Sequence, residues 1–406
     1  MKKIILSAIM FAFAISSFAK EEEKLFKIDV YGFVNYEMMF DTRQVVSARD
    51  GHVLLYPANE KFDDDGNDIN ATPSFNFLVL SSRLGGKISG PKAFGAKTMA
   101  HIEGDLMGTG GSMKSHARLR HAYVSFIWER SELLAGQTWH PMFVAACFPH
   151  TVTFAGGVPY HALNRSPQLK YAYNLNAFKI SAALMSHNDF ASLGPSGASS
   201  EYIRNSMFPE IAMQALYNTD KFLMGFTGGY QVIMPQKETP EGYSTDEKMK
   251  SMYASFFTKI VFPSLTFKTQ TSYGENNGHL VMLGGYGQAD IIDTDREIYS
   301  YEGIHALSSW VDFETNGDKF KAGLLAGYAQ NLGSKKEIIT AYARGSDIAH
   351  MYRIAPRVVY SSGKVKLGLE FHYDVAAYGI PDAKFNFNST KDIANMRTVL
   401  SIKYVF

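Results

Sequence analysis

Several arginines of this chain stand two or four positions apart, a spacing that places their side chains on one face of an extended strand. Arg118 and Arg120 form one such pair, and Arg353 and Arg357 form another. Arg165 stands alone at the start of a further extended segment. A fixed guanidinium binds carboxylate or phosphate through two parallel hydrogen bonds, so these residues could attract anionic solutes. They could equally form structural ion pairs with the carboxylates of neighbouring strands.

Those carboxylates occur in segments where charged and apolar residues alternate. In the segment 95–106, the residues Ala100, Ile102 and Leu106 share one face, and the other face carries Lys97, His101, Glu103 and Asp105. In the segment 364–375, apolar residues at the odd positions from Val365 to Val375 alternate with Lys364, Lys366, Glu370, His372 and Asp374. A lysine near the midplane of a bilayer costs about 2–4 kcal/mol, so we expect these charged faces to line a wet interior.

Other residue types that support chemistry are poorly spaced. His140, His150 and His161 lie about ten residues apart on one loop, with no carboxylate or cysteine at ligand spacing, so we expect no metal site. The acidic run 63–68 lacks the spacing and the closing glutamate of a calcium loop. No Gly-x-Ser-x-Gly, His-Glu-x-x-His or Walker-type motif is present, and His187-Asn188-Asp189 is the nearest approach to a catalytic cluster. The sequence therefore predicts no catalytic residues and no cofactor.

The elements that carry these side chains are strands. Period-two alternation and turn residues predict sixteen of them, near residues 25–40, 76–88, 95–106, 117–128, 132–138, 168–174, 178–187, 210–218, 221–232, 252–262, 264–273, 308–316, 319–329, 352–361, 364–375 and 396–406. Seven short links alternate with eight long ones along the whole chain. This pattern is typical of an antiparallel transmembrane β-barrel with short periplasmic turns and long outer loops, and sixteen strands enclose an aqueous channel.

The third long loop, Trp139–Pro167, is unusually apolar. It contains four prolines and no Asp or Glu. We expect it to fold inward against the barrel wall and to narrow the pore. The alternative is that it packs at a subunit contact.

Both ends of the chain point to the outer membrane. Lys2 and Lys3 precede an apolar stretch of about a dozen residues and a small-residue cleavage site, so residues 1–19 are predicted to be a signal peptide and residues 20–406 the barrel. The last strand, Met396–Phe406, alternates and ends on an aromatic residue. Charged residues make up only 19% of the chain, and the formal charge of +1 gives no support for nucleic-acid binding.

Several segments resemble a known family, the DcaP-like trimeric outer-membrane porins. The resemblance covers the first 175 residues and is carried by 31–41 (YGFVNYEMMFD), 81–90 (SSRLGGKISG), 101–108 (HIEGDLMG), 117–126 (ARLRHAYVSF), 133–143 (LLAGQTWHPMF) and 164–173 (NRSPQLKYAY). It implies a sixteen-stranded barrel, a homotrimer and passive uptake of small solutes. It also implies that Arg118 and Arg120 line the pore and that Arg165 lies near the constriction. The N-terminal coiled-coil segment of many members is expected to be absent, since only Lys20–Lys24 precede the first strand.

The predicted function is that of a porin in the outer membrane, through which small hydrophilic solutes diffuse passively. The near-zero charge of the mature chain limits the expected preference for anions to a mild one. The predicted lining is Lys97, His101, Glu103, Asp105, Arg118, Arg120, Arg165, Arg353, Arg357, Lys366, Glu370 and His372. Two alternatives stay open: a surface adhesive or structural barrel that binds through the long loops 41–75 and 274–307, and an outer-membrane hydrolase.

Overall fold

A computed structural model describes residues 26–108 and 115–406 of the chain. The predicted signal peptide, residues 1–19, lies outside the described residues and stays a prediction. Among the described residues, no helix has the length and apolarity to cross a bilayer.

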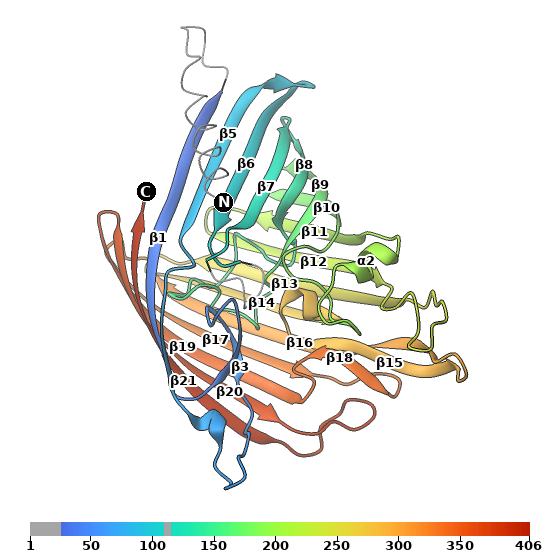
Figure 1. Cartoon of the computed structure of the whole chain (residues 1–406). Helices are drawn as coiled ribbons and strands as arrows, with labels where there is room; N and C mark the ends of the chain where they lie inside the picture. Colours follow the sequence, from blue (N-terminus) through green and yellow to red (C-terminus); the bar gives the residue numbers. More distant parts are fainter. Residues whose placement is uncertain (1–25, 109–114) are drawn as a thin grey trace, which may run out of the picture.

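Antiparallel strands form a closed barrel whose wall has sixteen strands (Figure 1). The wall consists of β1 (Lys27–Asp41), β4 (Ser74–Leu78) continued by β5 (Arg83–Ala93), β6 (Ala96–Asp105), β7 (Arg118–Ile127), β8 (Ser131–Trp139), β9 (Arg165–Leu175), β10 (Phe178–Met185), β11 (Glu210–Asn218), β12 (Phe222–Ile233), β13 (Met249–Val261), β14 (Leu265–Glu275), β16 (Ile298–Thr315), β17 (Phe320–Asn331), β19 (Ile348–Ser362), β20 (Val365–Tyr378) and β21 (Lys391–Val405). β1 closes the barrel by pairing with β21, with Phe33 opposite Val405. Gly32 and Phe406 add two backbone hydrogen bonds of 3.1 and 3.0 Å to this seam.

The wall has an apolar outer face and a polar inner face. On β21, Met396, Leu400, Ile402 and Tyr404 are exposed on the outside, whereas Arg397, Val399 and Ser401 are buried on the inside. On β20, Leu367, Phe371 and Tyr373 are exposed, and Glu370, His372 and Asp374 are buried. Both patterns confirm the predicted faces, apart from Val375, which is buried although its position predicts the outer face.

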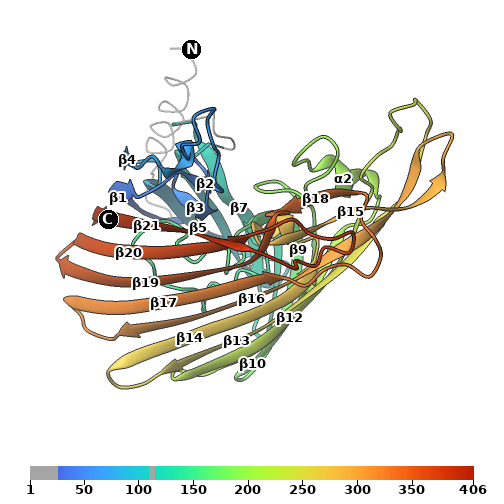
Figure 2. The ribbon, with the colours of Figure 1, turned by 90° about the horizontal axis from the view of Figure 1, so that it is seen from below.

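The alternation of short turns and long loops is also confirmed. Figure 2 shows this for β13 to β20, whose turns gather at the end of the barrel that carries the C-terminus and whose loops lie at the opposite end. The main difference from prediction is in β16, which starts at Ile298 instead of near residue 308. Its early part pairs with β15 (Gly284–Asp293), and β15 pairs in turn with β18 (Thr340–Arg344). These strands satisfy one another's backbone groups, so the sheet continues past the wall into segments that were predicted to be loop.

The first half of loop 1 (residues 42–73) folds into the barrel, which the sequence did not predict, whereas residues 59–73 are mostly exposed. The loop contains the hairpin of β2 (Val45–Ala48) and β3 (Val53–Pro57) and a short 3-10 turn, η2 (Ile69–Ala71). All five residues of β3 are buried. The Tyr378 hydroxyl on β20 donates a hydrogen bond of 2.6 Å to the Pro57 carbonyl, which fixes the hairpin against the wall.

Candidate pore constriction

Loop 3, residues 140–164, connects β8 to β9 and lies inside the barrel. Its apolar side chains join one buried cluster with inward-facing residues of the wall. The cluster includes Val144, Cys147, Val158, Tyr160 and Leu163 of the loop together with Leu223, Phe257, Trp310, Leu325 and Met351. A loop without acidic residues gains free energy by burying this surface, so its composition explains its inward position.

The backbone of loop 3 is held by charged side chains of the wall. Arg353 on β19 donates to the carbonyls of Gly156 (2.6 Å) and Val158 (2.7 Å). Glu370 on β20 accepts from the amide N–H of Val152 (2.9 Å) and from that of the next residue (3.0 Å). Buried peptide groups need such partners, so these two side chains determine where the loop can lie.

The other arginine of β19 holds the wall rather than the loop. Arg357 binds Asp312 through two hydrogen bonds of 2.6 and 3.1 Å and Glu314 through one of 3.1 Å. Arg353 in turn binds Asp374 at 2.5 Å. Both arginines, which were predicted to line the pore, are buried and paired with carboxylates.

A second group of arginines lies on the neighbouring arc of wall from β5 to β9. Arg118 binds Asp105 through two hydrogen bonds of 3.0 and 2.6 Å. Arg120 binds Glu103 at 2.6 Å and Asp105 at 3.1 Å. These are the ion pairs that the sequence offered as the alternative to free, anion-attracting arginines. Arg118 and Arg120 are therefore buried in the wall.

Arg165 has a partner that sequence spacing did not predict. Its guanidinium pairs with Asp189, which follows β10 in loop 4, residues 186–209. Arg49 of loop 1 and Arg118 bind the same carboxylate, at 2.9 and 3.3 Å. Burial alone would raise the pKa of Asp189, but the three guanidinium groups hold this pKa below its usual range.

We call these residues the arginine cluster: Arg49, Arg83, Arg118, Arg120 and Arg165 with Glu103, Asp105 and Asp189. Five guanidinium groups face three carboxylates, so the cluster has an excess of positive charge. Four buried guanidinium nitrogens have no hydrogen-bond partner among the described residues: Nε of Arg49, Nε of Arg83, and Nε and Nη2 of Arg165. Buried donors of this kind favour an anionic or polar occupant.

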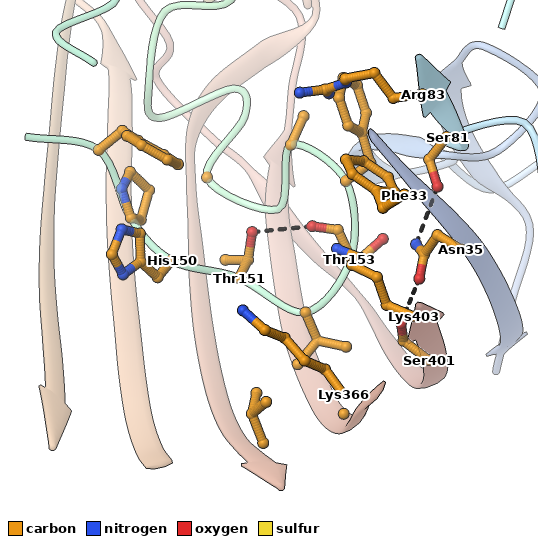
Figure 3. A pocket seen from close by; sticks show the side chains of 18 of the residues that line it. Phe33, Asn35, Ser81, Arg83, His150, Thr151, Thr153, Lys366, Ser401 and Lys403 are labelled. Atoms are coloured by element: carbon orange, nitrogen blue, oxygen red, sulfur yellow. Dashed lines mark hydrogen bonds between the residues drawn. The ribbon is translucent and has the colours of Figure 1, made fainter. Parts of the chain in front are cut away.

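A cavity of about 880 Å³ lies between loop 3 and the turn end of the wall (Figure 3). Lys366 and Lys403 extend into it from β20 and β21, toward Thr151 and Thr153 of loop 3. Apart from histidines, its charged lining consists of Arg83, Arg120, Lys321, Lys366 and Lys403 with Glu314 and Asp318. Cations therefore outnumber carboxylates here as well. The aromatic part of the lining is Phe33, Trp139, Phe143, Phe148 and Phe154.

Arg83 reaches this cavity because of a change of register. Its position relative to Phe75 and Phe77 predicts the outer face unless a bulge intervenes. On β1, Glu37 pairs with Leu78 and Phe33 pairs with Arg83. These two pairs are separated by four residues on β1 but by five residues on the β4–β5 side. One extra residue between β4 and β5 thus inverts the faces and turns Arg83 inward.

The remaining predicted lining residues lie on the inner face in different surroundings. Lys97 is exposed near the turn end of β6 and does not line the cavity. His101 and Glu103 share a hydrogen-bond network with the Tyr31 hydroxyl, at 2.5 and 2.7 Å. His372 is buried 3.2 Å from Glu370. The arginines and lysines of the cavity that are missing from the predicted set are Arg83, Lys321 and Lys403.

The three histidines of loop 3 do not meet. His161 is buried against Trp310, and burial lowers its pKa to about 3. His150 contacts Glu314 at 3.0 Å beside the cavity, and His140 contacts Glu210 at 2.8 Å elsewhere. The candidate catalytic cluster is divided too, because Asp189 binds arginines while His187 binds Glu210.

The comparisons with known proteins agree with this architecture. The model of the DcaP outer membrane protein family matches residues 24–238, more than half of the chain. The chain belongs to this family. It is therefore an outer-membrane protein, as both ends of the sequence predict. No curated protein matches the chain significantly.

Solved structures of the family and of other porins share the fold. The outer membrane channel DcaP of Acinetobacter baumannii is 17% identical, with a TM-score of 0.68, over 96% of this chain and 99% of that one. An anion-selective porin from Comamonas acidovorans is 10% identical, with a TM-score of 0.58, over 94% and 100%. A trimer form of OmpT from Vibrio cholerae is 13% identical, with a TM-score of 0.55, over the same shares. At these identities the likeness shows the barrel fold alone.

Proposed function

We propose that this protein is a porin through which small hydrophilic solutes diffuse passively, with a preference for anions. The observation that carries the proposal is the cavity below loop 3, whose lining has five arginines and lysines against two carboxylates. Fixed cations in a narrow, weakly screened space raise the local concentration of anions. Family membership and the structural neighbours support the channel role, and the anion preference is our inference from the lining.

The arginines and lysines have different proposed roles. Lys366 and Lys403 act as the mobile charges of the pore, because they reach into the cavity on flexible stems. The arginine cluster supplies a fixed positive potential beside the loop. Arg353 and Arg357 are positioning residues that keep loop 3 and the wall in place. Solutes cross without any chemical step.

We further propose a homotrimer, which the trimer form of the structural neighbour OmpT supports. Outer-membrane lipid would cover the apolar outer face that remains outside the subunit contacts.

An adhesive role is less well supported. Loop 1, one of the two loops that could have reached a partner, has its hairpin buried in the barrel, which leaves the exposed residues 59–73 as the part that could reach a partner. The β15 and β18 extension is the feature that favours adhesion, since it projects beyond the wall strands (Figure 2). A barrel that serves only adhesion would not conduct ions, so conductance separates the two functions.

Planar bilayers provide the test. We expect stepwise conductance from the purified protein and, under a KCl gradient, a zero-current potential displaced toward that of chloride. Lys366→Glu should move this potential toward that of potassium. Lys364→Glu makes the same charge change in the adjacent turn, outside the cavity lining, and serves as the control. A folded protein that leaves bilayers silent, or equal selectivity in both variants, would refute the proposal.

A further inference from the structure

A separate cluster of histidines surrounds Glu210, the first residue of β11. His140 Nε2, from the start of loop 3, lies 2.8 Å from Glu210 Oε1. His279 Nε2, from the 3-10 turn η3 (Asn277–Leu280), lies 3.4 Å from the same oxygen. His187 Nε2, from loop 4, lies 2.9 Å from Glu210 Oε2. The four side chains are buried, and they join three loops to one wall strand.

The cluster lacks a compensating cation. The ion-pair partners of Glu210 among the described residues are these three histidines, without an arginine or lysine. The Tyr253 hydroxyl adds a neutral hydrogen bond of 2.5 Å. A buried carboxylate without an arginine or lysine partner is unfavourable, so the site attracts positive charge.

His279 shows where that charge would bind. Its Nδ1 lies 3.0 Å from the Asn276 carbonyl, which can only accept, so the ring proton is on Nδ1. The lone pair of Nε2 then faces Glu210 Oε1, and Nε2 has no hydrogen-bond partner among the described residues. This nitrogen is therefore not engaged by the described part of the protein and is available to bind a cation. A histidine that donates its other ring N–H to a backbone carbonyl is the usual arrangement of a metal ligand.

The spacing of the ligand atoms agrees with a metal ion. One ring nitrogen each of His140 and His279 and a Glu210 oxygen all lie within 4.8 Å of one another. Two ligands at zinc-like bond lengths of about 2.0–2.1 Å and a tetrahedral angle are about 3.4 Å apart. Imidazole and carboxylate together suit zinc and its neighbours better than calcium or magnesium.

We propose that His140, His279 and Glu210 bind a zinc-class divalent cation, with His187 beside the second carboxylate oxygen as a further ligand. His140 must change tautomer for this, because its Nδ1 now accepts from the Met142 amide N–H at 3.1 Å. Metal binding replaces the His140–Glu210 hydrogen bond and moves the ring proton to Nδ1. The ring must then turn away from the Met142 amide, because two N–H donors cannot face each other. The bound ion links loop 3, loop 4 and loop 6 (residues 276–297) to β11. It thereby fixes the position of the first residue of loop 3.

Spacing along the sequence could not predict this site. The sequence placed His140 in a set with His150 and His161, none of which lies near a carboxylate in the chain. In the structure, the neighbours of His140 are His187, Glu210 and His279, which lie 47, 70 and 139 residues further along the chain. Only closure of the barrel brings them together.

The test is direct metal binding by the full-length protein folded in detergent. After treatment with EDTA, the protein is dialysed against ZnCl₂ and its zinc is counted by mass spectrometry. We expect one zinc per chain, and with CoCl₂ we expect the visible absorption bands of cobalt in a tetrahedral site. Glu210→Gln and His279→Asn should each weaken zinc binding at least tenfold.

His150→Asn is the matched control, because His150 lies on the same loop but is largely exposed. This variant should bind zinc as the wild type does. Heat-modifiable migration on gels verifies that each variant is folded. If Glu210→Gln does not fold, the zinc count and cobalt spectrum of the wild-type protein still decide the question. Substoichiometric zinc, absent cobalt bands, or equal losses in all three variants would overturn the proposal.

Discussion

Arg353→Met tests whether wall side chains hold loop 3 in the pore. Arg353 donates to two loop 3 carbonyls, to the Leu54 carbonyl of loop 1 at 3.2 Å, and to Asp374. Methionine fills much of the same volume but donates no hydrogen bond. Each carbonyl left buried without a partner costs about 1–3 kcal/mol, so docking of loop 3 should weaken by about 2–6 kcal/mol.

A loss of even 2 kcal/mol raises the undocked fraction of loop 3 roughly 30-fold. We therefore expect larger single-channel conductance and frequent transitions between current levels in bilayers. An undocked loop 3 should also be cut faster by a protease. Chymotrypsin is suitable, because residues 140–164 contain Phe and Tyr, after which it cuts, but no Lys or Arg for trypsin. The fragments can be identified by mass spectrometry.

Arg357→Met is the control for loss of a buried arginine from the same strand. Arg357 binds Asp312 and Glu314, which contact loop 3 only at His150. Its loss should therefore destabilise the wall, while the segment around Gly156 and Val158 that Arg353 holds stays protected from chymotrypsin. Equal conductance and cleavage in wild type and Arg353→Met would refute the reasoning, as would identical changes in both variants.

Two further predictions concern barrel closure and pH. A Cβ at Gly32 would lie 2.4 Å from the Arg83 carbonyl oxygen and 2.7 Å from the Phe406 ring, whereas one at Gly86 would meet nothing within 4 Å. Gly32→Val should therefore reduce the heat-modifiable folded fraction, and Gly86→Val should not; equal folding of the two would contradict the seam geometry. Asp189 has a lowered pKa, so its charge stabilises the folded state above the usual Asp pKa of about 4, and this stabilisation is lost as the pH falls through the lower folded value. The melting temperature of the wild type should thus fall more steeply than that of Asp189→Asn as the pH is lowered below about 4, and parallel curves would exclude this role.

The barrel could be predicted because each wall strand carries its own evidence. On β20 and β21, alternation between apolar and charged residues fixes which side faces lipid, and the structure confirms it with one exception at Val375. Turn residues and loop lengths then give the number of strands. The inward position of loop 3 was also predictable, because its composition does not suit an outer loop in water.

What could not be predicted depends on contacts between distant residues. Asp189 of loop 4 binds Arg49 of loop 1 and Arg165 because the loops come together inside the barrel. No local sequence pattern indicates this contact. The buried hairpin of loop 1 has strands as short as those of many exposed hairpins, so its sequence does not show that it is buried. The inward direction of Arg83 depends on the extra residue between β4 and β5. The pairing with β1 shows this residue, but the spacing of the sequence does not.

The anchoring of loop 3 has a consequence for assembly. Arg353 and Glu370, which hold its backbone, follow the bound residues by about 200 positions in the chain. The loop cannot reach its final place until β19 and β20 have joined the wall. Narrowing of the passage therefore follows the incorporation of these two strands into the wall.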